Sequence, residues 1–428
     1  MSNTTAPLTA ANLAAATKSD RNRAVDLYRV IAMVAVAVGH WLAMVAIDDN
    51  GELVGGNALE FIPALSWATW LLQVMPLFFV VGGFSSAISL DSHNAKGGNA
   101  QDWIAARLRR MMPPAITLAG VWLAVIAAAA AVGQAPLAIQ GAAAAAIPLW
   151  FLANYTIDTA LAPFVLPRFR RNPVGFGGLI LGSFLTFEAM RIAGVPVLPH
   201  LNWVLGWLAF QMLGMAWRDG MLPTGRTLVA LAGTFWAAAL AAVLSGGPWH
   251  TSMVNFPGME NSPTAPPTLA LLLFGTAYSL TAIHFAPQVS NWLAERPKAW
   301  AGVIAANTVA MSVYLWHMTA AVIVMAATHM TIGLSDAAVG SAEWWMLKIP
   351  TVLASSLVLA PIVVLVSGIE RKALLAPRRP WNGSLGSMLA VAAVTSFALK
   401  FWTSGNPVLI VGSCAVLVLL GRTAYATN

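Results

Sequence analysis

Apolar runs of about 20 residues recur along the whole chain, which is the length that a helix needs to cross a membrane. Charged residues make up only 9% of the 428 residues, against roughly 25% in soluble domains. The runs therefore exceed what the core of a soluble fold requires. A membrane β-barrel would show short alternating segments instead of unbroken runs. The sequence predicts an all-α, polytopic transmembrane helical bundle in a lipid bilayer.

The positions of these runs predict the domain organisation. Residues 1–20 are polar and lack the apolar core of a signal peptide, which predicts a disordered cytoplasmic tail. Residues 21–370 contain ten predicted spans, and residues 371–428 contain a polar linker and two more. The twelve predicted spans are residues 27–47, 61–90, 113–133, 143–166, 174–194, 201–217, 227–245, 267–286, 302–329, 345–368, 384–402 and 406–421.

The basic residues predict the orientation of the spans. Lys and Arg are enriched in cytoplasmic loops, and an inside N-terminus puts all but three of the 23 basic residues on that side. The exceptions, Arg191, Lys348 and Lys400, lie near the outer ends of spans. We therefore expect a multi-pass protein of the cell membrane with both termini in the cytoplasm. Because the basic residues are spread over short gaps, the net charge of +7 does not indicate nucleic-acid binding.

The first span carries ionisable residues on one face. Arg29 and His40 are eleven residues apart, or three helical turns plus about 20°, and Asp26 lies one turn before Arg29. The helical rise separates Arg29 from His40 by about 16 Å, which places His40 near mid-membrane. Such residues face a partner or a cavity. His40 is therefore a helix–helix hydrogen-bonding group or a general base, and Arg29 is a topology anchor or a cavity residue.

Two arginines and a second histidine are further candidates. Arg107 and Arg110 lie one helical turn apart in an expected cytoplasmic loop. Their guanidinium groups suit the phosphates of a ligand or of anionic lipid. His317 lies in the ninth predicted span, flanked by Tyr314 and Trp316. A structural hydrogen bond and a role at a site both remain open for His317.

The remaining polar residues predict one ion pair, and the absence of known motifs from the sequence argues against several kinds of site. Glu188 precedes Arg191 by one turn, which predicts an ion pair near the outer end of its span. No Walker loop, dinucleotide fingerprint or HExxH motif is present. The histidines are scattered over different spans, so no metal site is expected. The single cysteine, Cys414, excludes an intrachain disulfide.

Five segments of the sequence are DLYRVIAMVAVAVGH, MPLFFVVGGF, RLRRMMPP, PLWFLANYTIDTALAP and SVYLWHM. In this order they resemble the motifs of acyltransferase family 3 membrane proteins. The first helix resembles the family's opening pattern of an acid, an arginine and then a histidine. Gly82 stands where the family usually has a serine.

The resemblance implies a ten-span core that transfers acyl groups, commonly acetyl, from cytoplasmic acyl-coenzyme A. The acceptor is a hydroxyl of an envelope sugar, lipid or glycolipid. Carried over to this sequence, His40 is the essential histidine and Arg29 its paired arginine. Arg107 and Arg110 are the donor-side arginines. The resemblance says nothing about the last two spans.

The sequence thus predicts a membrane O-acyltransferase that uses acyl-coenzyme A, most simply acetyl-coenzyme A, and no metal. His40 would deprotonate the acceptor hydroxyl or carry the acyl group covalently. Substrate-binding or supporting roles are expected for Asp26, Glu188, Tyr314, Trp316 and His317. The alternative is a proton-coupled transporter or flippase of an envelope precursor, which would use the same intramembrane residues. Transporters often show paired repeats with broken helices, and none is visible here.

Overall fold

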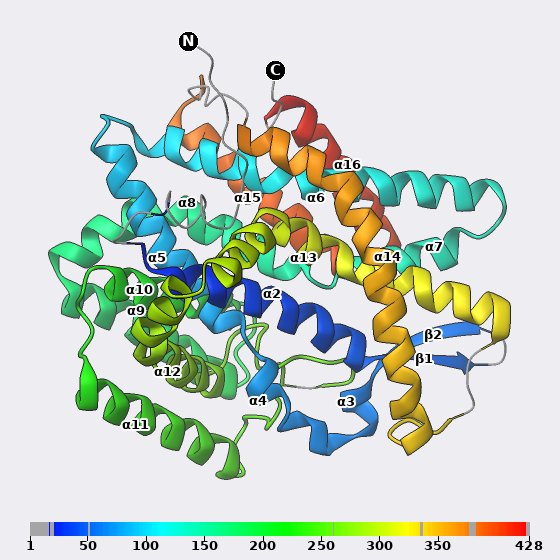
Figure 1. Cartoon of the computed structure of the whole chain (residues 1–428), viewed down its shortest axis with the longest axis horizontal. Coiled ribbons are helices and arrows are strands. Elements are labelled where there is room, and N and C mark those ends of the chain that lie inside the picture. The colour runs from blue at the N-terminus through cyan, green and yellow to red at the C-terminus, as the bar shows by residue number, and fades with distance from the viewer. Residues whose placement is uncertain are drawn as a thin grey trace.

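The computed structural model is a bundle of helices with one small hairpin (Figure 1). It describes residue 17 and residues 21–49, 52–259, 261–333, 337–375 and 382–424. Within these ranges, ten helices are long and apolar enough to cross a membrane. The predicted all-α polytopic bundle is therefore confirmed. Most of the tail at 1–20 and part of the linker, residues 376–381, lie outside the described residues.

The first half of the chain forms α2 to α8. Its segments are α2 Arg23–Ala43, β1 Met44–Asp49, β2 Glu52–Asn57, α3 Ala58–Phe61, the 3-10 turn η1 Pro63–Ser66, α4 Thr69–Leu72, α5 Met75–Asn94, α6 Ala100–Ala131, α7 Ala135–Ala146 and α8 Leu149–Arg171.

The second half forms α9 to α16. Its segments are α9 Pro173–Ile192, the 3-10 turn η2 Leu198–Leu201, α10 Asn202–Arg218, α11 Gly225–Leu244, α12 Leu269–Ala294, α13 Pro297–Ile332, α14 Ala342–Leu375, α15 Leu385–Trp402 and α16 Pro407–Thr423. All twelve predicted spans thus contain a helix. Two of these helices, α10 and α16, have 17 residues each, the lower end of the spanning range of about 17–25.

The helix of the first predicted span ends earlier than expected. It was expected to reach residue 47, but α2 ends at Ala43 and the chain continues into β1. β1 pairs antiparallel with β2, with Met44 opposite Asn57. Short apolar runs do not distinguish strand from helix. The Asn-Gly dipeptide in the sequence between the β1 and β2 segments is a stronger signal for strands than hydropathy, because that dipeptide is typical of hairpins.

Two other boundaries also differ from the prediction. The arginine segment was expected in a loop before Pro113, but it lies inside α6, which begins at Ala100. Asn99 caps that helix by accepting a 2.9 Å hydrogen bond from the amide of Asp102, and a cap of this kind stabilises an early start. The predicted span at 143–166 is divided between α7 and α8, and Pro148 stands directly before α8. Proline favours the start of a helix because it has no amide hydrogen to donate.

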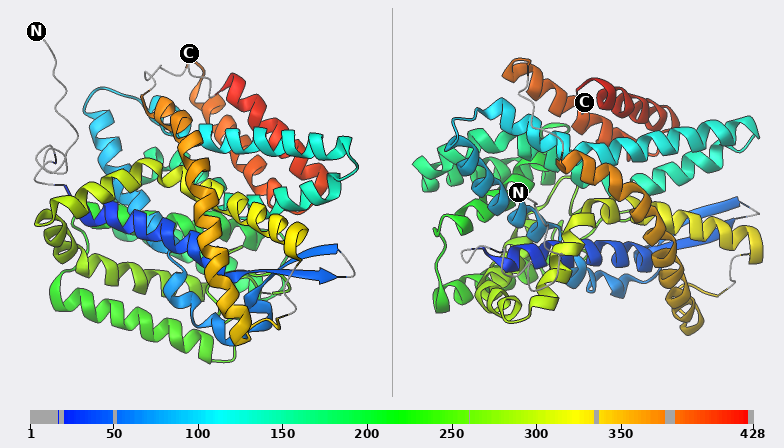
Figure 2. Two further views of the ribbon diagram at one scale, coloured as in Figure 1. Left: turned by 45° about the vertical axis from the view of Figure 1, so that its right-hand side comes forward. Right: turned by 45° about the horizontal axis from the view of Figure 1, so that its top comes forward.

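The last two helices pack into the bundle beside α6 and α8 (Figure 2). The hydroxyl of Ser396 on α15 donates a 2.8 Å hydrogen bond to the Ala153 carbonyl of α8. Gly421 on α16 approaches α6 so closely that a Cβ there would lie 2.7 Å from Ile116. Leu399, Trp402 and other α15 and α16 side chains are fully buried. These helices therefore complete the bundle wall.

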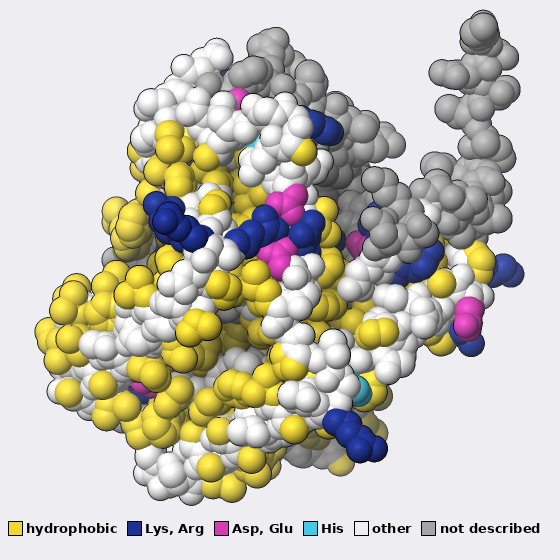
Figure 3. Space-filling model, turned by 90° about the vertical axis from the view of Figure 1, so that its left-hand side faces the viewer, with side chains coloured by type: hydrophobic (Ala, Val, Ile, Leu, Met, Phe, Trp, Pro, Cys, Tyr) yellow, Lys and Arg dark blue, Asp and Glu magenta, His cyan; other side chains and the backbone are white. Residues whose placement is uncertain are grey.

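The helix ends that connect α5 to α6, α8 to α9 and α10 to α11 gather at one end of the bundle (Figure 1). Basic and acidic side chains gather on this end, between areas of hydrophobic side chains (Figure 3). Arg170 and Arg218 pair with both Asp91 and Asp219 at 2.6–2.8 Å. The four side chains link the ends of α5, α8 and α10.

Candidate active site

Two histidines meet in the middle of the bundle. His40 Nδ1 lies 3.0 Å from His317 Nε2, and the two rings are stacked with their centroids 5.1 Å apart. His317 is completely buried, and its backbone carbonyl accepts a 2.9 Å hydrogen bond from the Trp41 indole. The neighbouring helices α2 and α13 therefore hold both imidazoles in a fixed arrangement.

The hydrogen bonds of this pair determine which nitrogen carries each proton. His317 Nδ1 lies 2.7 Å from the Tyr314 carbonyl oxygen, which can only accept. A neutral His317 therefore carries its proton on Nδ1 and accepts at Nε2. His40 must then donate from Nδ1 to His317, because that nitrogen faces an acceptor. The result is a neutral His40 in the tautomer whose lone pair is on Nε2, as a general base acting through that nitrogen requires.

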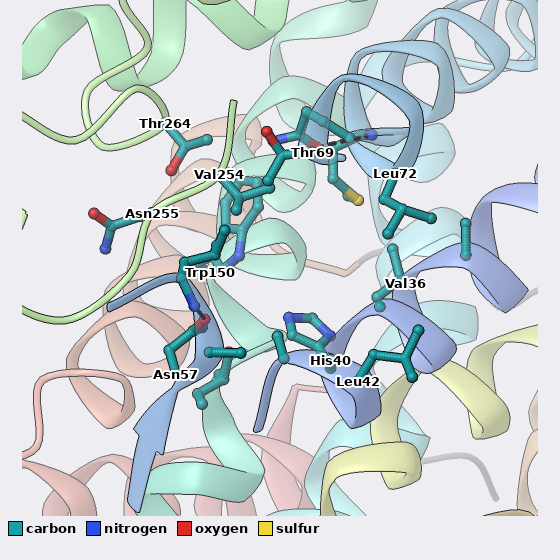
Figure 4. A pocket seen from close by; sticks show the side chains of 18 of the residues that line it. Val36, His40, Leu42, Asn57, Thr69, Leu72, Trp150, Val254, Asn255 and Thr264 are labelled. Atoms are coloured by element: carbon teal, nitrogen blue, oxygen red, sulfur yellow. Dashed lines mark hydrogen bonds between the residues drawn. The ribbon is translucent and has the colours of Figure 1, made fainter. Parts of the chain in front are cut away.

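His40 also lines a cavity of about 500 Å³ (Figure 4). This volume lies within the roughly 300–1,000 Å³ of small-molecule sites. Leu42, Leu72 and Val36 form part of an apolar wall, and Thr69 adds a polar group. Figure 4 shows the His40 ring and Trp150 facing the same space from opposite sides. The combination of an apolar wall and a few polar groups is typical of a binding site.

The long connection between α11 and α12 closes part of this cavity. Val254, Asn255 and Thr264 from that connection line the cavity (Figure 4). The connection is held to α4, because Thr69 Oγ1 accepts a 2.8 Å hydrogen bond from the Met253 amide. The cavity is thus built from segments far apart in the sequence.

Arg29 and one of the two expected donor-side arginines, Arg107, converge on one residue of α5. Arg29 donates a 3.0 Å hydrogen bond to the Ser85 hydroxyl, and Arg107 donates a 3.3 Å hydrogen bond to the Ser85 carbonyl. Arg29 also lies 3.7 Å from Asp26 and 3.3 Å from the Asn307 side-chain oxygen. Two guanidinium groups, one from α2 and one from α6, therefore lie next to Ser85. Arg29 is on the face of α2 that also carries His40.

The other candidate site residues lie at different positions relative to the cavity. Tyr314 lines the cavity, but its hydroxyl donates to the Pro148 carbonyl. Trp316 is buried on α13 and does not line the cavity. Arg110 follows Arg107 by one turn on α6 and is half-buried. Among the described residues, no group of three His, Cys, Asp or Glu side chains could hold a metal ion.

Glu188, for which a substrate-binding or supporting role was expected, lies outside the cavity. Its predicted pair with Arg191 is confirmed at 2.8 Å. The same carboxylate accepts hydrogen bonds from the Trp249 indole at 2.8 Å and from the Leu269 amide at 3.1 Å. Glu188 therefore fixes both ends of the α11–α12 connection. It supports the cavity from a distance.

The departure from the family pattern at Gly82 has a structural counterpart. A Cβ at this position would lie 2.7 Å from Tyr155 of α8, and the Tyr155 hydroxyl oxygen would be 3.0 Å away. The tyrosine ring therefore occupies the space that a serine side chain would need. Its hydroxyl places a polar atom near the same point of the bundle.

Sequence reasoning missed Ser85, Asn307 and Lys400 as members of the site. Ser85 directly follows the recognised MPLFFVVGGF segment, and Asn307 lies in the ninth predicted span. Both are small polar residues within apolar runs, which is a weak signal because such residues also serve helix packing. Lys400 was read only as an exception to the charge bias.

The helices define a multi-pass membrane protein with a histidine at an internal cavity. The chain belongs to acyltransferase family 3, because the family model for this acyltransferase domain matches residues 22–368. The protein is therefore a membrane acyltransferase. The match ends before α15 and α16. No curated protein and no solved structure matches the chain.

Proposed function

We propose that this acyltransferase moves an acyl group, most simply acetyl, from cytoplasmic acyl-coenzyme A to a hydroxyl of a cell-envelope glycan, lipid or glycolipid. The observation that carries the proposal is His40, which lines the cavity while the buried His317 holds its other nitrogen. The distribution of basic residues supports a location in the cell membrane with both termini in the cytoplasm.

His40 acts in this mechanism as the general base. Its Nε2 removes the proton of the acceptor hydroxyl while the oxygen attacks the thioester carbonyl carbon. The tetrahedral intermediate then collapses, the carbon–sulfur bond breaks, and the proton passes from His40 to the departing sulfur. An oxygen ester replaces the thioester, and His40 returns to its neutral form. A relay in which Nε2 first takes the acyl group would use the same nitrogen.

Arg29 and Arg107 are proposed to hold the phosphates of coenzyme A. Guanidinium groups bind phosphate oxygens in pairs of hydrogen bonds, and both side chains already lie at Ser85. Along α2, Arg29 is about 16 Å from His40, a distance that the pantetheine arm can span. Coenzyme A would thus stay at the cytoplasmic side while its thioester reaches the cavity.

The catalytic assignment can be tested with the purified full-length protein in lipid vesicles. Acetyl-coenzyme A and an envelope extract are supplied, and release of the free thiol is followed. We expect His40→Ala to reduce the rate by about 10²- to 10⁴-fold. His329→Ala, on the same helix as His317 but outside the cavity, is the matched control. Normal turnover by His40→Ala would rule out its catalytic role.

The donor site has its own matched pair of variants. Arg107→Gln should raise the KM for acetyl-coenzyme A by about tenfold or more, because a charge-assisted hydrogen bond is lost. Arg109→Gln is the control, since Arg109 lies on the same helix with its Nε directed to the Ala424 carbonyl. Equal KM values for Arg107→Gln and the unaltered protein would favour a contact with lipid.

A further inference from the structure

The cavity of His40 contains a cation supplied by a helix outside the family match. Lys400 and Thr403 line this cavity. Both belong to the end of α15 and the turn that follows it. Because the family match ends at residue 368, this part of the cavity wall belongs to the C-terminal addition.

The packing of α15 explains why Lys400 faces the cavity. Ser396 precedes Lys400 by four residues and Thr403 follows it by three, so the three lie along one side of the helix. Ser396 is bonded to the Ala153 carbonyl of α8. A different side, about 100° round the helix, carries Phe397 and Phe401, which are 58% and 46% exposed as expected for contact with lipid. The lysine is therefore directed to the protein side of α15.

Two observations fix the electrostatic character of this part of the cavity. The Lys400 ammonium lies 5.5 Å from the centroid of the Trp203 ring, which lines the same cavity. Among the described residues, no Asp or Glu lines the cavity, and Lys400 forms no ion pair. A sheltered charge without a counter-ion is unfavourable, and an anionic ligand removes this cost.

We infer that the acceptor carries an anionic group, a phosphate or a carboxylate, which Lys400 binds while His40 activates the acceptor hydroxyl. This inference rests on the proposed acyl transfer. The apolar wall formed by residues such as Leu42 and Leu72 accommodates an apolar part of the same acceptor. Lys400 is thus a specificity-determining residue, and α15 adapts a family core to an anionic acceptor.

Binding can be measured without turnover. Hexyl phosphate and hexyl glucoside are added in turn to the purified full-length protein, and its Tm is recorded. A ligand that binds the native state raises the Tm. We expect hexyl phosphate to raise it for the unaltered protein and for Lys400→Arg, and to leave Lys400→Met unchanged. Hexyl glucoside should have no effect that depends on Lys400. Equal shifts for the unaltered protein and Lys400→Met with hexyl phosphate would overturn the inference.

Turnover then tests acceptor class. An envelope extract is separated by anion exchange, and each fraction is incubated with labelled acetyl-coenzyme A. We expect label in the anionic fraction, with the KM for that fraction raised about 10- to 100-fold in Lys400→Met and largely restored in Lys400→Arg. The kcat should change little, because Lys400 binds and does not take part in proton transfer. Phosphate analysis of the labelled product distinguishes a phosphate from a carboxylate.

Two contrary results have different meanings. Label that appears only in the neutral fraction and depends on His40 leaves acyl transfer intact but overturns the anionic acceptor. Absence of His40-dependent label from both fractions overturns the proposed function and this inference together.

Discussion

The protonation of His40 depends on a carbonyl that it does not touch. The Tyr314 carbonyl fixes the proton of His317, and His317 in turn accepts the proton of His40 Nδ1. This chain of hydrogen bonds leaves His40 Nε2 available to the cavity. In the proposed mechanism, His317 is therefore a positioning residue.

His317 provides a test of this arrangement. His317→Leu removes the acceptor for His40 Nδ1, so we expect kcat to fall by about 10- to 10³-fold with little change in KM. His317→Gln retains a side-chain acceptor oxygen and should recover part of the rate. The measurement is steady-state kinetics with acetyl-coenzyme A. A KM effect without a kcat effect would show that His317 acts on substrate binding instead.

Two glycines set the distance between α5 and α10. A Cβ at Gly83 would lie 1.9 Å from the Gln211 carbonyl oxygen, and a Cβ at Gly214 would lie 1.9 Å from the Val80 carbonyl oxygen. Small residues allow membrane helices to approach closely. The two helices thus form a tight pair next to the cluster of Phe79, Phe151 and Trp207.

The glycine contact predicts a clear stability difference. Gly214→Ala should destabilise the protein by about 1–3 kcal/mol, because the added methyl group meets backbone that cannot rotate away. Gly233→Ala in α11 is the control, since nothing lies within 4 Å of its Cβ position. Unfolding followed by circular dichroism in detergent gives both values. If Gly214→Ala left the free energy of unfolding unchanged, α5 and α10 would not be tightly packed.

At the scale of the whole molecule, the charged end of the bundle joins three helices through four side chains. Hydrogen bonds from Arg170, with a smaller contribution from Arg218, lower the pKa of the Asp219 carboxyl. A carboxyl whose folded pKa is lowered stabilises the fold above its unfolded pKa, near 3.9. That stability is lost as the pH falls through the folded pKa.

Arg170→Met should therefore lower the Tm most at neutral pH. Among the described residues, the variant leaves Asp91 and Asp219 with Arg218 as their one shared partner. The difference from the unaltered protein should shrink below about pH 4, as the Asp219 carboxyl becomes protonated. Arg171→Met is the control, because Arg171 is the exposed neighbour. A pH-independent difference would mean that Arg170 stabilises the fold by packing alone.

The proposed orientation can be checked by labelling. Ser404 and Lys298 are exposed at opposite ends of the bundle, and the single native Cys414 is buried. In intact cells, a membrane-impermeant maleimide should label Ser404→Cys and leave Lys298→Cys unlabelled until the cells are lysed. The reverse pattern would invert the proposed topology.

Much of this protein could be predicted from sequence because membrane physics acts on local patterns. The length of apolar runs required helices, and helical periodicity placed Asp26, Arg29 and His40 on one face. Local patterns also predicted the Glu188–Arg191 pair, since its members are one turn apart. The hairpin after α2 and the long α6 were missed, because hydropathy alone does not record turns and caps.

By itself, the sequence determined the class of fold and the family resemblance, and it predicted a catalytic role for His40. The tertiary structure decided which groups surround that histidine. His317 lies 277 positions away in the chain, and Lys400 is further still. Contacts over such separations depend on how helices pack, which no local pattern specifies. Lys400, which in the sequence was only an exception to the charge pattern, is therefore seen to line the cavity only in the tertiary structure.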